Sequence, residues 1–246
     1  MMLAIDSLSP RADKVHVVRD NECETWRSDY TERKLGVPQL LLVEQKVPGS
    51  QILPHFHDLD QFQVFMDDHG RLGHHSIAPI SIHYTNSHTG YGPIVAGEKG
   101  FSYYVFRPDF AIGGSYYLHV PEARAHLKPG GKRVLMAEGV SLMPPEKLTQ
   151  LITPQIKRLI GVKEGEPDAG VFVDEVNLGP AMEYRGPDPA DGGGQVFLLV
   201  HGSITSGATT LSGRASLALT KDEPAATVKS GSQGAQLLIF QYPKRG

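Results

Sequence analysis

Short apolar or alternating runs, separated by glycine and proline, recur along the whole chain. Gly (27) and Pro (18) are both frequent. Runs of this kind are typical of half-buried strands, and glycine or proline between them marks turns. The pattern predicts an all-β protein of the sandwich or barrel type. Strands are expected at residues 15–18, 40–45, 62–65, 80–84, 102–106, 115–120, 171–174, 196–200, 216–219 and 237–242.

Only one stretch has helical periodicity. In "PPEKLTQLITPQIKRLIG", residues 144–161, aliphatic residues recur at spacings of three and four. Pro145 suits a first helical turn, Pro154 should kink or split the helix, and Gly161 is placed to end it. The sequence therefore predicts a helical connector that packs against a sheet.

Two short motifs recur in the same order at nearly the same distance. "QVFMDDHG" begins at Gln63 and "QVFLLVHG" begins at Gln195, 132 residues later. "GFSYYVFRP" begins at Gly100 and "GAQLLIFQYP" begins at Gly234, 134 residues later. A period this long indicates a duplicated domain rather than a solenoid. The expected parts are an N-terminal β-domain at 1–125, a helical connector at 126–165 and a C-terminal β-domain at 166–246.

Composition and charge exclude several classes of partner. The net charge is −3 and there is no long run of Lys or Arg, so no basic surface for nucleic acid is expected. The longest apolar run, around residues 39–43, is too short to cross a bilayer. The N-terminus lacks the pattern of a signal peptide, and Cys23 is the only cysteine. We therefore expect a cytoplasmic protein that binds neither nucleic acid nor membrane.

Candidate chemistry is concentrated in the first half. Seven of the eleven histidines lie between His55 and His88. His55 and His57 are two positions apart, so in an extended strand they share a face and can chelate one ion. Solvated or hydrogen-bonded imidazoles are the alternative interpretation of the same pair.

Around this pair the sequence resembles the first motif of the cupin superfamily. That motif has a glycine, then His-x-His, a glutamate and a closing glycine. Here Gly49 precedes the histidine pair, Gln61 stands where the family has glutamate, and Gly70 takes the place of the closing glycine. The resemblance implies two jelly-roll β-barrels, a bicupin, with motif residues only in the N-terminal half.

The second cupin motif resembles "APISIHYTNSHTGYGP", residues 78–93. In cupins this motif supplies a third metal-binding histidine, and that position falls on Tyr91. His83 lies inside the expected strand and His88 lies in the turn. We therefore expect His83, His88 or Tyr91 to complete the metal site, with His83 the better imidazole because a strand can point it into a barrel.

The full ligand set that the resemblance implies has a weak member. His55 and His57 are expected to bind the metal directly, while the Gln61 amide is a weak ligand or orients the others. The ion is expected to be a divalent transition metal: Fe, Mn, Ni or Zn. In the C-terminal half the matching positions hold no imidazole, carboxylate or phenol.

Three hypotheses for the function follow from this resemblance. The first is a metal-dependent enzyme that acts on a small organic molecule, such as a dioxygenase. The second is a metal-free barrel that binds a small molecule or uses His and Tyr as acid–base groups. The third is a non-catalytic bicupin. Phe65, His88 and Tyr104 are expected to line the pocket for the small molecule, and the family resemblance implies a homodimer.

Overall fold

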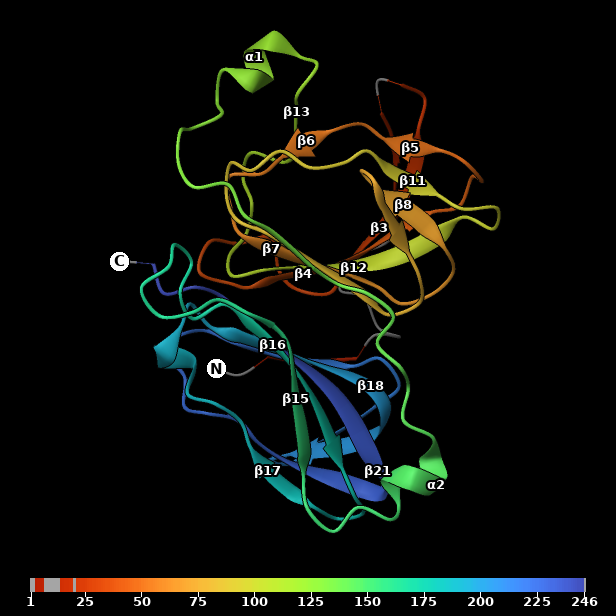
Figure 1. Ribbon diagram of the computed structural model, residues 1–246, viewed down its shortest axis with the longest axis vertical. Helices are drawn as coiled ribbons and strands as arrows, with labels where there is room; N and C mark the ends of the chain where they lie inside the picture. Colours follow the sequence, from red (N-terminus) through yellow and green to blue (C-terminus); the bar gives the residue numbers. More distant parts are fainter. Residues whose placement is uncertain (1–2, 7–13, 20, 246) are drawn as a thin grey trace. The chain divides into compact units, whose positions relative to one another are not determined.

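The chain folds into two compact units, which Figure 1 shows as a ribbon. The computed structural model describes residues 3–6, 14–19 and 21–245. The N-terminal unit is Arg11–Val140, and the C-terminal unit is Ser141–Gly246 together with Met1–Pro10. Both consist mostly of β-structure, as predicted. No helix in the described part of the chain is long and apolar enough to cross a membrane.

The N-terminal unit is built on a seven-stranded antiparallel sheet. Its order is β14 (Val134–Ala137), β10 (Ser81–Thr85), β7 (Gln61–Phe65), β12 (Phe101–Arg107), β4 (Gln39–Gln45), β3 (Glu24–Asp29) and β2 (Val15–Val18). Every residue of β7 and β10 is buried, because each of these strands has a neighbour on both sides within the sheet.

A smaller sheet forms the second layer of this unit. Its order is β5 (Gln51–Ile52), β11 (Ile94–Ala96), β8 (Gly70–Leu72) and β9 (His75–Ile77). A short ribbon pairs β6 (His55–Phe56) with β13 (Tyr116–Tyr117), and the one-turn helix α1 (Pro121–Arg124) follows. Apolar side chains from both sheets, such as Val43, Ile94 and Phe101, form one core cluster.

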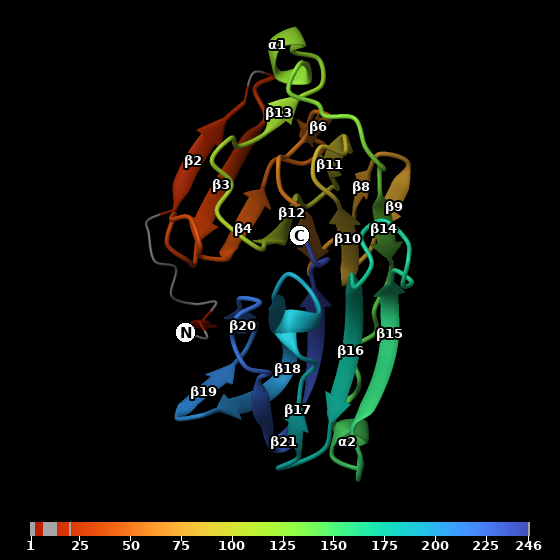
Figure 2. The same ribbon diagram turned by 90° about the vertical axis from the view of Figure 1, so that its left-hand side faces the viewer.

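The C-terminal unit has one eight-stranded sheet. The order of six strands is β1 (Leu3–Ile5), β20 (Ser216–Leu219), β18 (Gln195–Ser206), β21 (Thr227–Gln241), β16 (Phe172–Leu178) and β15 (Gln155–Gly161). Of the other two strands, β17 (Glu183–Arg185) pairs with β21, and β19 (Thr209–Ser212) pairs with β18. Two short helical turns, α2 (Pro145–Leu148) and η1 (Pro189–Asp191), complete it. Figure 2 shows β15 and β16 side by side.

The strands of the two units follow the same order. The path β10–β7–β12–β4–β3 in the first unit matches β20–β18–β21–β16–β15 in the second. The repeated sequence motifs lie on matching strands, β7 with β18 and β12 with β21. The pairings of the described residues form open sheets, and no closed barrel is found among them.

The prediction of a helix over residues 144–161 is wrong for most of its length. Helix α2 ends at Leu148, and residues 155–161 form strand β15, which pairs with β16. Pro154 disfavours helical geometry at the residue before it, and Arg158 makes an ion pair with Asp174 across the two strands. The connector is therefore not helical, because sheet pairing decides the structure of an ambiguous apolar pattern.

Candidate functional site

His55 and His57 lie at the wall of a cavity in the N-terminal unit. Both are buried, and their ring centroids are 5.2 Å apart. Strand β6 positions His55, whose backbone N–H and C=O pair with the backbone of Tyr91 at 3.1 and 3.0 Å. The structure thus places the two histidines together and brings Tyr91 beside them.

Each imidazole is anchored through one nitrogen. Nδ1 of His55 lies 2.8 Å from the Leu53 carbonyl, and Nδ1 of His57 lies 2.5 Å from the Gly114 carbonyl. A backbone carbonyl can only accept a hydrogen bond, so each Nδ1 carries the proton. The Nε2 atoms of both rings are therefore left as acceptors.

The Tyr91 hydroxyl connects His55 to Gln61. The Gln61 amide Nε2 donates to the Tyr91 oxygen at 2.5 Å. The same hydroxyl lies 2.9 Å from His55 Nε2 and donates to it, because that nitrogen has no proton of its own. The result is a directed chain of hydrogen bonds from an amide through a phenol to an imidazole.

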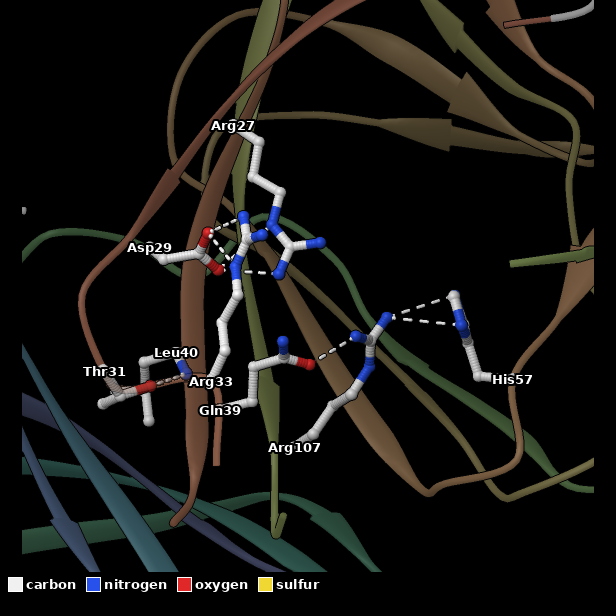
Figure 3. Close-up of polar contacts among 8 residues, drawn as sticks. All are labelled: Arg27, Asp29, Thr31, Arg33, Gln39, Leu40, His57 and Arg107. Atoms are coloured by element: carbon white, nitrogen blue, oxygen red, sulfur yellow. Dashed lines mark hydrogen bonds and ion pairs between the residues drawn. The ribbon is translucent and has the colours of Figure 1, made fainter. Parts of the chain in front are cut away.

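Arg107, at the end of β12, holds the other side of the site (Figure 3). Its Nη2 lies 3.2 Å from His57 Nε2 and donates to Gln61 Oε1 at 3.0 Å. Its Nη1 donates to Gln39 Oε1 at 2.6 Å. The guanidinium is buried, so a permanent positive charge stands within the site.

The sequence analysis did not identify Arg107, although a signal was present. On a strand, alternate side chains share a face, and Tyr103, Val105 and Arg107 all line the cavity. Because Arg107 is charged and follows Tyr103 and Val105 on the same face of the strand, it was a candidate site residue. The predicted strand ended at residue 106, one position too early to include it.

His83 is buried beside the cavity but is not among its lining residues. It lies on β10 opposite Gln63, and its Nδ1 donates to Gln63 Oε1 at 2.8 Å. Its ring centroid is 5.1 Å from that of Tyr91, and its Nε2 has no hydrogen-bond partner.

The three residues expected to contact a substrate lie outside the cavity lining. Phe65 packs in the core between Phe101 and Tyr103. Tyr104 alternates to the opposite face of β12 and contacts Tyr30. The backbone N–H of His88 donates to the His57 carbonyl at 2.7 Å. The turn that contains His88 therefore holds the backbone at His57 and does not form the cavity wall.

The cavity has a volume of about 320 Å³. Aliphatic side chains from β4, β5 and β12 form part of its wall, and arginine, histidine, tyrosine and glutamine side chains form the rest. The lining residues are Val17, Arg19, Thr25, Arg27, Leu41, Val43, Ile52, His55, His57, Gln61, Gln63, Tyr91, Tyr103, Val105, Arg107, Gly114, Ser115 and Tyr117. This combination of an apolar wall with a few convergent polar groups is typical of a small-molecule site.

Burial keeps the site uncharged except for its arginines. It lowers the pKa of His55 to about 4. Burial and then the charge of Arg107 lower the pKa of His57 well below its usual range. Burial also raises the pKa of the Tyr91 phenol far above its ordinary value. At neutral pH both imidazoles are neutral and the phenol keeps its proton.

These residues do not fit the divalent metal that the cupin resemblance implies. Among the described residues, no group of three or more His, Cys, Asp or Glu side chains is arranged to hold a metal ion. His55 Nε2 faces the Tyr91 hydroxyl and His57 Nε2 faces the Arg107 guanidinium. The positive charge of Arg107 disfavours a metal cation at the same place, and no aspartate or glutamate is among the described residues that line the cavity.

Comparison with known proteins gives the fold. No protein-family model and no curated protein matches this chain. The pirin YhhW of Escherichia coli, in complex with nickel(II), is 10% identical with a TM-score of 0.59, and the match covers 100% of both chains.

Two further solved structures resemble the chain over most of its length. Quercetin 2,3-dioxygenase of Acinetobacter baumannii is 10% identical with a TM-score of 0.54, covering 99% of this chain and 79% of that one. Oxalate decarboxylase of Lactobacillus farciminis, in a formate complex, is 12% identical with a TM-score of 0.55, covering 96% and 85%. All three are cupin-superfamily proteins, so the chain has a cupin-type fold. At these identities the likeness concerns the fold alone.

Proposed function

We propose that this chain is a cupin-type enzyme that moves a proton to and from a small organic molecule without a bound metal. The observation that carries the proposal is the Tyr91 hydroxyl, which lies at the cavity wall between Gln61 Nε2 and His55 Nε2.

The hydrogen-bond directions define how the proton would move. A proton leaves the substrate and binds to the Tyr91 oxygen while the tyrosine proton passes to His55 Nε2. The substrate becomes an anion and the imidazole becomes a cation, and the reverse transfer restores both. Gln61 donates to the tyrosine oxygen throughout and fixes its position, while the Arg107 charge favours the anion.

A metal-dependent dioxygenase is the hypothesis that the similar structures suggest. The pirin is in complex with nickel(II), and the quercetin enzyme is a 2,3-dioxygenase. In this chain an amide replaces the expected carboxylate, a phenol replaces the third imidazole, and Arg107 adds positive charge. The site therefore favours the metal-free hypothesis over the metal-dependent one.

We also infer that the two units arose by duplication, as in a bicupin. The matched strand order and the two repeated motifs support this inference. In the C-terminal unit, Gln195 on β18 hydrogen-bonds to Gln241 on β21 at 2.8 Å. The cavity lined by His55, Tyr91 and Arg107 lies in the N-terminal unit, so the proposed activity is assigned to that unit.

The first prediction is tested by proton exchange. Protein dialysed against EDTA is incubated in D2O with pyruvate and 2-oxobutyrate, and loss of the protons beside the carbonyl carbon is followed by NMR. We expect EDTA treatment to leave the exchange rate unchanged, and Tyr91→Phe to lower it by roughly 100-fold or more, since positioned acid–base groups contribute factors of this size.

Tyr104→Phe is the matched control, because Tyr104 lies on the opposite face of β12 from the cavity. It should exchange at the wild-type rate. Exchange that requires added Fe, Mn, Ni or Zn would contradict the proposal and favour the metal-dependent enzyme. Equal rates in Tyr91→Phe and wild type would contradict the role of Tyr91.

A further inference from the structure

We propose that the cavity of the N-terminal unit binds a small organic carboxylate, whose negative charge is recognised by Arg107 and Arg19. This inference rests on the proposed function for the use of the cavity and adds the chemical class of its ligand.

The charge of the cavity wall is positive. Three arginines line the cavity, and none of the described residues that line it is an aspartate or a glutamate. The charge of Arg27 is balanced by the carboxylate of Asp29, which lies 2.7 Å from Arg27 Nη2 and also binds Arg33 (Figure 3). An anion in the cavity would meet the charges of Arg107 and Arg19.

Hydrogen bonds to side chains of the site hold both arginines in place. Arg107 donates to the amide oxygens of Gln39 and Gln61. Arg19 donates through Nη1 to the Tyr117 hydroxyl at 2.5 Å. These bonds fix the two guanidinium groups before a ligand arrives, which lowers the entropic cost of binding.

Arg19 also has a donor that the protein does not use. Its Nε is buried and has no hydrogen-bond partner among the described residues. Leaving such a donor unpaired is costly, and an anionic acceptor would satisfy it. The planar guanidinium matches the geometry of a carboxylate better than an ammonium group does.

The apolar part of the wall favours an organic anion over an inorganic one. Leu41, Val43, Ile52 and Val105 line the same cavity as the arginines. A phosphate or sulfate ion would leave this surface uncovered, whereas the carbon skeleton of a small carboxylic acid would cover it. The volume of about 320 Å³ lies at the small end of the range for ligand pockets.

The test compares acids with amides of the same shape. Binding of butyrate and butyramide, and of benzoate and benzamide, is measured by isothermal titration calorimetry on the full chain at pH 7. We expect the acid of at least one pair to bind at least about tenfold more tightly than its amide, as loss of a charge-assisted contact predicts. Arg107→Gln should remove this preference.

Arg33→Gln is the matched control, because Arg33 is half exposed, binds Asp29 and does not line the cavity. It should keep the acid preference within about twofold, since Arg107 and Arg19 still line the cavity. If Arg107→Gln does not fold, then Arg107→Lys and Arg19→Gln take its place, and each should reduce the acid preference. Equal binding of acid and amide, no binding of either, or an unchanged preference in the arginine variants would overturn the inference.

The outcomes separate this inference from the proposed proton transfer. Carboxylate binding that depends on Arg107, without any Tyr91-dependent exchange, would support the ligand class and contradict the proposed activity. Tyr91-dependent exchange with equal acid and amide binding would support the activity and contradict the ligand class.

Discussion

Gln61 makes contacts that a carboxylate could not make. Its amide oxygen accepts hydrogen bonds from Arg107 at 3.0 and 3.2 Å, while its amide nitrogen donates to the Tyr91 hydroxyl. An ionised carboxylate is an acceptor only, so it could not direct the Tyr91 proton toward His55 in the same way. The amide thus belongs to this hydrogen-bond network and is more than a weakened metal ligand.

The second prediction concerns this amide. We expect Gln61→Glu to form an ion pair with Arg107, which would neutralise the charge available to a ligand. Binding of benzoate or butyrate, measured by calorimetry, should weaken by at least about tenfold. The variant should still bind no stoichiometric transition metal by elemental analysis, because Arg107 and Tyr91 remain in the site.

The control for the added charge is Gln51→Glu, at an exposed position of β5 in the same unit. It should leave carboxylate binding unchanged. One equivalent of bound metal in Gln61→Glu would show that the missing carboxylate alone prevents metal binding, and would contradict our account of Arg107.

The long strands of the C-terminal unit bend where their pairing shifts. Strand β18 pairs with β21 along most of its length, with register shifts between Leu199 and His201 and between Gly202 and Ile204. Gly202 has a φ of +84°, which disfavours any residue with a Cβ atom. Such bulges let one strand pair with different partners at its two ends, β20 and then β19.

The third prediction tests this bend. A Cβ atom at Gly202 would lie 2.2 Å from the Gly234 carbonyl oxygen, so Gly202→Ala combines a backbone clash with left-handed strain. We expect the free energy of unfolding to fall by about 3 kcal/mol or more, measured by urea denaturation with circular dichroism.

The turn residue Gly207 provides the comparison. It has a φ of +57°, but no atom lies within 4 Å of the position of a Cβ. Gly207→Ala should therefore lower the free energy of unfolding only through its left-handed backbone conformation, by about 1 kcal/mol. Equal losses in the two variants would show that the close approach at Gly202 has no energetic effect.

The distribution of histidines makes the two units respond differently to acid. The N-terminal unit contains the buried imidazoles of His55, His57 and His83, and burial lowers the pKa of His83 to about 3. The C-terminal unit contains one histidine, His201. Since the folded state holds the three rings neutral, the unfolded state binds more protons once the pH falls below about 6.5.

The fourth prediction follows from the sign of this difference. Stability from the neutral rings is fully present above about pH 6.5 and is lost as the pH falls toward 4 and then 3. Between about pH 6.5 and its pKa in the folded state, each ring should lower the free energy of unfolding by about 1.4 kcal/mol per pH unit. Trp26, the only tryptophan, lies in β3, so its fluorescence reports on the N-terminal unit during urea unfolding at pH 7, 6 and 5.

The His83→Gln variant supplies the comparison, because it removes one of the three titrations. Its unfolding midpoint should depend less steeply on pH than that of the wild type. A wild-type midpoint that is constant from pH 7 to 5, or that rises as the pH falls, would contradict the neutral, buried state of the imidazoles.

The sequence by itself determined the class of fold and ten of the strands in the two units. Each predicted strand overlaps an observed one, because alternation and turn residues are local properties of the chain. The spacing of His55 and His57 also predicted their shared position. The same local rules failed at residues 155–161, where helical and strand patterns are both compatible with the apolar positions and pairing with β16 decided between them.

The surroundings of the two histidines were decided only by the tertiary structure. Gln39, Gln61 and Arg107 meet although 68 and 46 residues separate Arg107 from its two partners. No local pattern encodes such a meeting, because it depends on the order in which β4, β12 and β7 pair. The resemblance to cupins implied a site for a metal cation. The pairing of the strands instead places a buried guanidinium beside His57, and its charge favours an anion.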